Sequence, residues 1–177
     1  MLLAALSLGS AALSAQTVKA VEDGKYDIKV GEITMTVNAA QGGKIVSYRL
    51  GDKEVLSQTR MPNSFGSTFW TSPQKEWNWP PVAEYDRKAF KAEVKGNVLV
   101  LTGEKSERFG YRVRKEFKAD AKNNSIAITY TIVNESGETR KVAPWEISRV
   151  PNGGMLFFDA KEATPANNMK GMNFVFE

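Results

Sequence analysis

Apolar and polar residues alternate along several short segments of the chain, with the period of two that is typical of half-buried β-strands. The clearest case is 125–134, where one predicted face carries Ile126, Ile128, Tyr130 and Ile132. The same pattern predicts further strands at 33–37, 44–50, 54–56, 90–95, 98–102, 113–118, 140–150 and 155–158. Beyond the first sixteen residues, no segment shows apolar residues at helical spacing over three turns.

Turn-forming residues separate these strands at 41–43, 51–53, 96–97, 120–124 and 135–138. Short strands joined by glycine and asparagine turns predict an all-β fold, an antiparallel β-sandwich. The polar segment 17–25 predicts a flexible entry to this domain. The strand-like residues 173–177 carry no stop signal, so we expect 26–177 to be the N-terminal part of a longer single β-sandwich domain, incomplete at its C-terminus.

The first residues resemble a secretory signal. Residues 1–15 contain no charge and run from a leucine- and alanine-rich block into small residues, which predicts a signal peptide cleaved after Ala15. The apolar block is too short for a stable membrane span. Basic residues before it are missing, which points to a true start upstream of Met1. A buried N-terminal helix is the alternative. A signal peptide predicts a periplasmic or secreted protein, and the absence of cysteine fits that location.

Composition excludes several kinds of chemistry. The 177 residues contain no histidine and no cysteine, which rules out histidine-dependent triads, histidine-bound zinc and thiolate nucleophiles. The net charge of +4 is spread along the chain without a basic cluster, so we expect no nucleic-acid partner. The scattered acidic residues lack the spacing of a metal loop. We therefore expect no metal and no cofactor.

Residues 64–81 hold most of the tryptophan in the chain. Trp70, Trp77 and Trp79 are interleaved with Ser72, Gln74 and Asn78 on a proline-broken backbone, which predicts a loop. Flat rings beside amides suit a polyhydroxylated ligand, because the apolar face of a sugar stacks on a ring while its hydroxyls find polar partners. Alternatively, the rings cap a hydrophobic core, with their N–H groups bonded to loop carbonyls.

The fourth tryptophan lies in the predicted strand 140–150. Alternation places Trp145 and Ile147 on one face and Glu146 on the other. A carboxylate beside aromatic surface would have its pKa raised by desolvation, which makes Glu146 the candidate catalytic acid or base. Arg149 could instead hold it ionised. The alternatives are an exposed Glu146 on an edge strand and a Trp145 that belongs to the core.

Two groups of residues resemble known proteins. Residues 42–48 and 51–56 resemble the opening hairpin of the galactose mutarotase-like (aldose 1-epimerase) superfamily. Residues 67–74, 143–147 and 153–154 are similar, more narrowly, to DUF4380, an uncharacterised bacterial family related to that superfamily. The resemblance spans roughly 30–158 and implies a β-supersandwich with a carbohydrate-binding concave face. It places the site at Trp70, Ser72, Gln74 and Glu146. The superfamily's histidine acid has no counterpart in this chain, so its catalytic roles do not transfer.

Three functions fit these observations. The first is an exported carbohydrate-binding protein without histidine-dependent epimerase chemistry, which binds its ligand through Trp70, Ser72, Gln74, Trp77, Asn78, Trp79 and Arg149, with Glu146 as a further hydrogen-bonding group. The second is a sugar-active enzyme, epimerase- or lyase-like, in which Glu146 acts with groups beyond Glu177. The third is a structural or adhesion module with aromatic anchors. The first two require Trp70 and Glu146 on the same side of a sheet.

Overall fold

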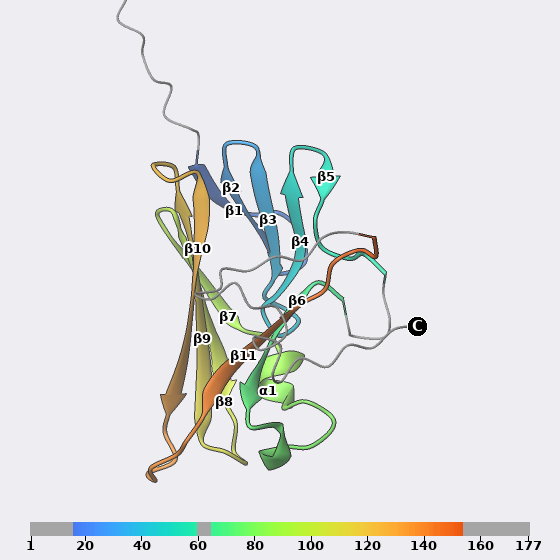
Figure 1. Cartoon of the computed structure of the whole chain (residues 1–177). Coiled ribbons are helices and arrows are strands. Elements are labelled where there is room, and N and C mark those ends of the chain that lie inside the picture. The colour runs from blue at the N-terminus through green and yellow to red at the C-terminus, as the bar shows by residue number, and fades with distance from the viewer. Residues whose placement is uncertain (1–15, 60–64, 154–177) are drawn as a thin grey trace, which may run out of the picture.

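The computed structural model describes residues 16–59 and 65–153, which form two antiparallel sheets facing each other (Figure 1). The larger sheet has the spatial order β1 (Gln16–Ala20), β2 (Lys25–Val30), β3 (Ile33–Asn38), β4 (Lys44–Leu50), β6 (Ser67–Ser72) and β11 (Ala143–Ser148), and the short β5 (Lys53–Glu54) pairs with β4. The smaller sheet has the order β10 (Ser125–Asn134), β9 (Tyr111–Asp120), β8 (Val98–Lys105) and β7 (Lys91–Lys95). The helices in these residues are the 3₁₀ turn η1 (Gln74–Glu76) and the one-turn α1 (Ala83–Asp86). The predicted all-β sandwich is confirmed.

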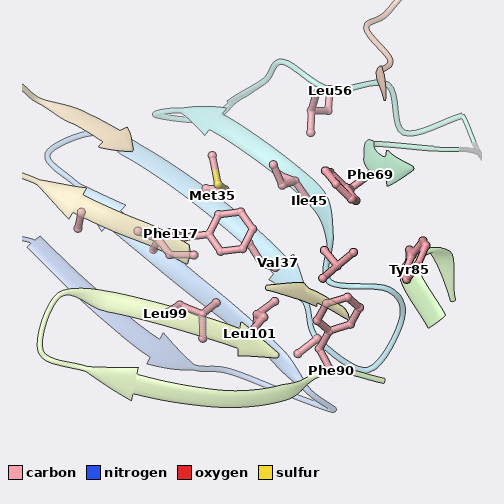
Figure 2. Packing of buried hydrophobic residues seen from close by; sticks show 14 of the residues in the cluster. Met35, Val37, Ile45, Leu56, Phe69, Tyr85, Phe90, Leu99, Leu101 and Phe117 are labelled. Atoms are coloured by element: carbon pink, nitrogen blue, oxygen red, sulfur yellow. The ribbon is translucent and has the colours of Figure 1, made fainter. Parts of the chain in front are cut away.

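The hydrophobic core fills the space between the two sheets (Figure 2). The larger sheet contributes residues such as Val37 and Phe69, and the smaller sheet contributes Leu99, Leu101 and Phe117. Each of these side chains is at most 1% exposed. Because burial of one such side chain stabilises a fold by about 1.5–3 kcal/mol, this interface holds the sandwich together.

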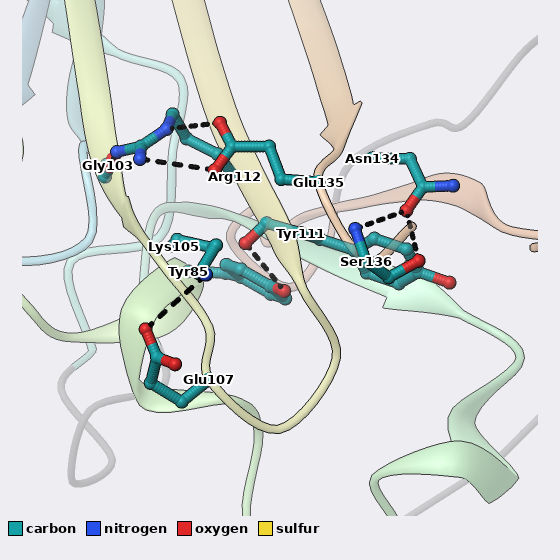
Figure 3. Close-up of polar contacts among 9 residues, drawn as sticks. All are labelled: Tyr85, Gly103, Lys105, Glu107, Tyr111, Arg112, Asn134, Glu135 and Ser136. Carbon is teal, nitrogen blue, oxygen red and sulfur yellow. Dashed lines mark hydrogen bonds and ion pairs between the residues drawn. The ribbon is translucent and has the colours of Figure 1, made fainter. Parts of the chain in front are cut away.

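Polar contacts fasten the loops at one end of the smaller sheet (Figure 3). The Tyr85 hydroxyl donates to the main-chain carbonyl of Tyr111 over 3.3 Å, which ties α1 to the start of β9. The Arg112 guanidinium donates to both oxygens of Glu135, at 2.8 and 3.3 Å, and to the carbonyl of Gly103 at 2.9 Å. These bonds connect the turn after β10 to β8 and β9.

Two segments differ from their predictions. Residues 17–20 were expected in a flexible entry but belong to β1, whose partners on β2 run from Gln16 with Val30 to Ala20 with Tyr26. Ser67–Ser72 was expected in a loop but forms β6, between β4 and β11. Its first five residues are all buried, so its two faces look alike in sequence and no alternation reveals the strand. The predicted signal peptide at 1–15 and strand at 155–158 lie outside the described residues.

Candidate functional site

The antiparallel pair β6–β11 presents two faces with different chemistry. In its register Trp70 lies opposite Trp145, and Phe69 lies opposite Glu146. The ring of Phe69 is 4.9 Å from that of Tyr130 on β10, so the Phe69 side looks toward the smaller sheet. We call this side the inner face and the Trp70 side the outer face. Successive side chains alternate, so the same-side placement predicted for Trp70 and Glu146 is wrong: the strand pair lies between them.

Four indoles gather on the outer face, and we call Trp70, Trp77, Trp79 and Trp145 the indole cluster. The ring centroid of Trp70 is 5.8 Å from that of Trp77, 6.0 Å from Trp79 and 5.5 Å from Trp145. All three contacts are edge-to-face, a favoured geometry for aromatic pairs. The cluster is separate from the main core of the described residues. Trp145 was expected in the main core, but it is half-buried and belongs to the indole cluster instead.

The four indoles differ in their access to solvent. Trp70 is 9% exposed and its Nε1 donates to Oδ1 of Asp86 over 2.9 Å. Trp77 is 4% exposed and donates to the carbonyl of Thr71 over 2.8 Å, which is the capping arrangement considered from the sequence. Trp79 is 64% exposed. Trp70 and Trp77 are therefore buried, whereas Trp79, which contacts Trp70, exposes most of its indole to solvent.

Polar residues surround Trp79 on the segment that follows β6. The carbonyl of Gln74 accepts hydrogen bonds from the N–H groups of Trp77 and Asn78, over 3.1 and 2.7 Å, which fixes the short turn η1. Asn78 adopts a left-handed φ of 59°, a conformation that asparagine tolerates better than most residues. The side chains of Gln74 and Asn78 are exposed, and Ser72 is half-buried at the end of β6. Exposed amide side chains therefore lie one and five residues before the exposed indole in the chain.

A charged group adjoins the indole cluster on the outer face. Nζ of Lys44 lies 3.7 Å from Oδ1 of Asp86, the same oxygen that accepts the Trp70 N–H. Arg149 donates to the Thr68 hydroxyl over 3.3 Å, and Thr68 precedes Trp70 by two residues on β6. Burial lowers the pKa of both Lys44 and Arg149, and the nearby Asp86 carboxylate opposes this change. Sequence reasoning found Arg149 but assigned no role to Lys44, which it treated only as part of the opening hairpin, or to Asp86, which belongs to no motif.

Gly42 allows α1 to approach the larger sheet closely enough to place Asp86. Its φ is +66°, and a Cβ at this position would lie 2.0 Å from the main-chain oxygen of Asp86. Gly42 N–H also donates to the carbonyl of Lys88 over 2.9 Å. Only glycine meets both demands, the positive φ and the close contact with backbone.

The inner face carries a second charged group, which consists of Lys115, Glu146, Ser67 and Tyr130. Lys115 is 1% exposed, and its Nζ donates to the carbonyls of Gly42 and Gly43 over 2.7 and 3.2 Å. Its ammonium also lies 5.2–5.7 Å from the ring centroids of Phe69, Phe90 and Tyr130. The Ser67 hydroxyl donates to Glu146 and lies 2.8 Å from that of Ser148.

Burial dominates the acid–base behaviour of the inner face. It lowers the pKa of Lys115 to about 7, against an ordinary value of 10.5, although the Glu146 charge acts in the opposite direction. It raises the pKa of Glu146, an effect opposed by Ser67, Lys115 and Tyr130. Glu146 nevertheless keeps access to solvent at the edge strand β11. The raised pKa expected for Glu146 is present, but Glu146 shares its surroundings with Lys115 and Tyr130 rather than with the indoles.

The described residues contain neither a metal-binding cluster nor a membrane-spanning helix. No group of three or more acidic residues in these ranges could hold a metal ion. No helix among the described residues has the length and apolar character needed to cross a bilayer.

Comparisons with known proteins give only a distant structural likeness. No family model and no curated protein matches the chain. The 4-alpha-glucanotransferase from Thermococcus litoralis is similar to the chain in structure, with 15% sequence identity and a TM-score of 0.44 over 69% of this chain. The match covers 25% of the glucanotransferase. At this identity and TM-score the likeness supports no statement about ligand or activity.

Proposed function

We propose that this chain is an exported carbohydrate-binding protein whose ligand lies on the outer face of β6 and β11. The observation that carries this proposal is the indole cluster, in which the buried ring of Trp70, itself packed against Trp77, contacts the 64% exposed ring of Trp79. An indole held in one orientation loses little entropy when a sugar stacks on it. The adjacent amides of Gln74 and Asn78 then provide hydrogen-bonding partners for hydroxyl groups.

The position of the cluster also supports the proposal. A tryptophan that only fills a core has no reason to expose its ring, yet exposing a large aromatic surface is typical of binding sites. The mutarotase-like resemblance, which we retain as part of the proposal, implies carbohydrate binding on the surface of a sheet. Glu146 lies on the other face of the strand pair from Trp70, so the predicted site that combined these two residues is given up. The site proposed here uses residues of the outer face alone, and Glu146 has no part in it.

Export forms a separate part of the proposal. Gln16, the residue after the expected cleavage point, is already paired with Val30 in the larger sheet. Cleavage after Ala15 would therefore leave β1 intact. Expression in a bacterial host followed by N-terminal sequencing of the periplasmic protein tests this, and a mature protein beginning at Gln16 is the expected result.

Titration with mono- and oligosaccharides, followed by tryptophan fluorescence, tests the binding proposal. We expect a saturable change in emission, and we expect Trp79→Ala to weaken binding by about tenfold or more, as truncation of a central aromatic contact commonly does. Val94→Ala is the matched control, because Val94 is an exposed apolar residue on the smaller sheet.

Two results would contradict the proposal. The first is the absence of any response across the sugars. The second is equal binding by Trp79→Ala and the unchanged chain. If Trp79→Ala instead abolished self-association of the chain, the exposed indole would be an interface anchor, as the structural or adhesion hypothesis requires.

A further inference from the structure

We propose that the sugar bound on the outer face is acidic and carries a carboxylate or sulfate that Arg149 binds. This inference rests on the proposed function, since it concerns the same site. Its basis is the guanidinium of Arg149 beside the indole cluster, whose side-chain hydrogen bond among the described residues goes to the neutral hydroxyl of Thr68. The carboxylates of Asp86 and Glu146 act on Arg149 through their charge, but neither lies within 4.0 Å of it as an ion pair.

The contacts identify Arg149 as the cation that can reach a ligand. Lys44 is 1% exposed and its ammonium lies beside Asp86, so a ligand on the surface cannot reach it. Arg149 is half-buried, and its guanidinium donates to the neutral hydroxyl of Thr68. Among the described residues no carboxylate lies within 4.0 Å of that guanidinium. A hydroxyl satisfies only part of its five donors, which leaves the guanidinium able to bind an oxyanion.

The strand register places this charge at a useful distance from the indoles. On the outer face of β6, Thr68 is the neighbour of Trp70, and on β11 its partner is Ile147, the neighbour of Trp145. Side chains two residues apart on a strand are separated by about 7 Å, roughly the span of one sugar ring. A sugar next to the indole cluster can therefore direct an acidic substituent at Arg149.

Burial makes the interaction stronger than it would be at the open surface. Desolvation lowers the pKa of Arg149, so the guanidinium has lost part of its hydration before a ligand arrives. A bound anion replaces the lost hydration with charge-assisted hydrogen bonds to the guanidinium. A carboxylate or a sulfate can form two such bonds at once, which matches the planar fork of arginine. A neutral sugar offers no such compensation.

The test compares sugars that share a shape and differ in charge. The full chain is titrated, with tryptophan fluorescence as the readout, against D-glucose, D-galactose, their uronates, the methyl esters of those uronates and the 6-sulfates. We expect at least one acidic sugar to bind about tenfold more tightly than its neutral counterpart, the effect of one charge-assisted contact. A preference for the uronate over the 6-sulfate, or the reverse, identifies the anionic group.

Variants assign the preference to Arg149. In Arg149→Gln the affinity ratio of acidic to neutral sugar should fall to about one, and Arg149→Lys should keep part of it because the charge remains but the fork is lost. Arg114→Gln removes an exposed guanidinium from the smaller sheet and should leave the ratio unchanged.

The outcomes separate this inference from the proposed function. Neutral sugars that bind as well as acidic ones overturn the inference and leave the carbohydrate site in place. The same conclusion follows if Arg149→Gln keeps the full preference. If no sugar of either kind binds, the proposed function fails and the inference fails with it.

Discussion

The two faces of the β6–β11 pair bury charge in different ways. On the outer face Lys44 lies beside the carboxylate of Asp86, which also accepts the Nε1–H of Trp70 in the indole cluster. On the inner face Lys115 lies among three aromatic rings and donates to two main-chain carbonyls. No carboxylate of the described residues is within 4.0 Å of its ammonium.

The inner charged group holds the two sheets together, whereas the outer charged group lies beside the proposed binding site. The Lys115 ammonium ties β9 to the turn at Gly42 and Gly43, so it connects the two sheets. The outer group connects only elements on one side of the larger sheet, and it leaves Trp79 and Arg149 accessible. Gly42 belongs to both arrangements, because its carbonyl accepts from Lys115 while its Cα lies against the backbone of Asp86.

The strongest test of this comparison truncates neighbouring residues of β6. Trp70→Ala and Phe69→Ala should each reduce the free energy of unfolding by about 3–5 kcal/mol, since both remove a large buried ring. Only Trp70→Ala should alter the native tryptophan emission, because the ring of Phe69 faces Tyr130 on the other side of the strand pair. Urea unfolding and emission spectra measure the two effects. A cost below about 1 kcal/mol for Trp70→Ala would show that the indole cluster is not tightly packed.

The second test uses the pH dependence of stability. The folded-state pKa of Lys115 is about 7 and its ordinary value is 10.5, so between these values the unfolded chain binds more protons than the folded chain. Stability should therefore rise with pH across this window, and the destabilising contribution is fully present below pH 7. Relative to Lys115→Met, the unchanged chain should gain at least about 1.4 kcal/mol, the equivalent of one pKa unit. Urea titrations of both proteins near each end of the window measure this gain, and parallel pH profiles would contradict the prediction.

The smallest effect concerns Glu146. Its folded-state pKa is raised above 4.5, so the folded chain binds more protons than the unfolded chain as pH rises from that value. The unchanged chain should therefore lose stability relative to Glu146→Gln as pH rises through this window. Because solvent screens the side chain, we expect a difference below about 1.4 kcal/mol. Thermal unfolding at several pH values checks the sign. If the unchanged chain instead lost stability as the pH fell, the charge of Lys115 would affect the pKa of Glu146 more strongly than burial does.

The sequence was sufficient where a strand has one buried face. The alternation in 125–134 predicted that Tyr130 and Ile132 point the same way, and both pack against the core. The alternation in 143–148 correctly separated Trp145 from Glu146. In the strand predicted at 113–118 the same alternation puts Lys115 on one face with Val113 and Phe117, although the carbonyls that bind its ammonium could not be foreseen.

The sequence did not predict which distant segments pair with each other, or in which register. Nothing near Trp70 indicates that Trp145 lies opposite it, and a shift of one residue would have placed Glu146 on the same face as Trp70. Lys44 and Asp86 meet only because Gly42 admits α1, which no local pattern reveals. The indoles and amides were thus recognised individually, while the charged group beside them required the fold.

The pairing of β6 with β11 has a consequence for the order in which the chain can fold. Ser67 and Ser148 are 81 residues apart, and all four strands of the smaller sheet are synthesised between them. Contacts over such separations carry a large loop-closure entropy and form late. A nascent chain can therefore form its earlier hairpins on the ribosome before Trp145 emerges. The indole cluster is then completed only when β11 pairs with β6, after the other strands are in place.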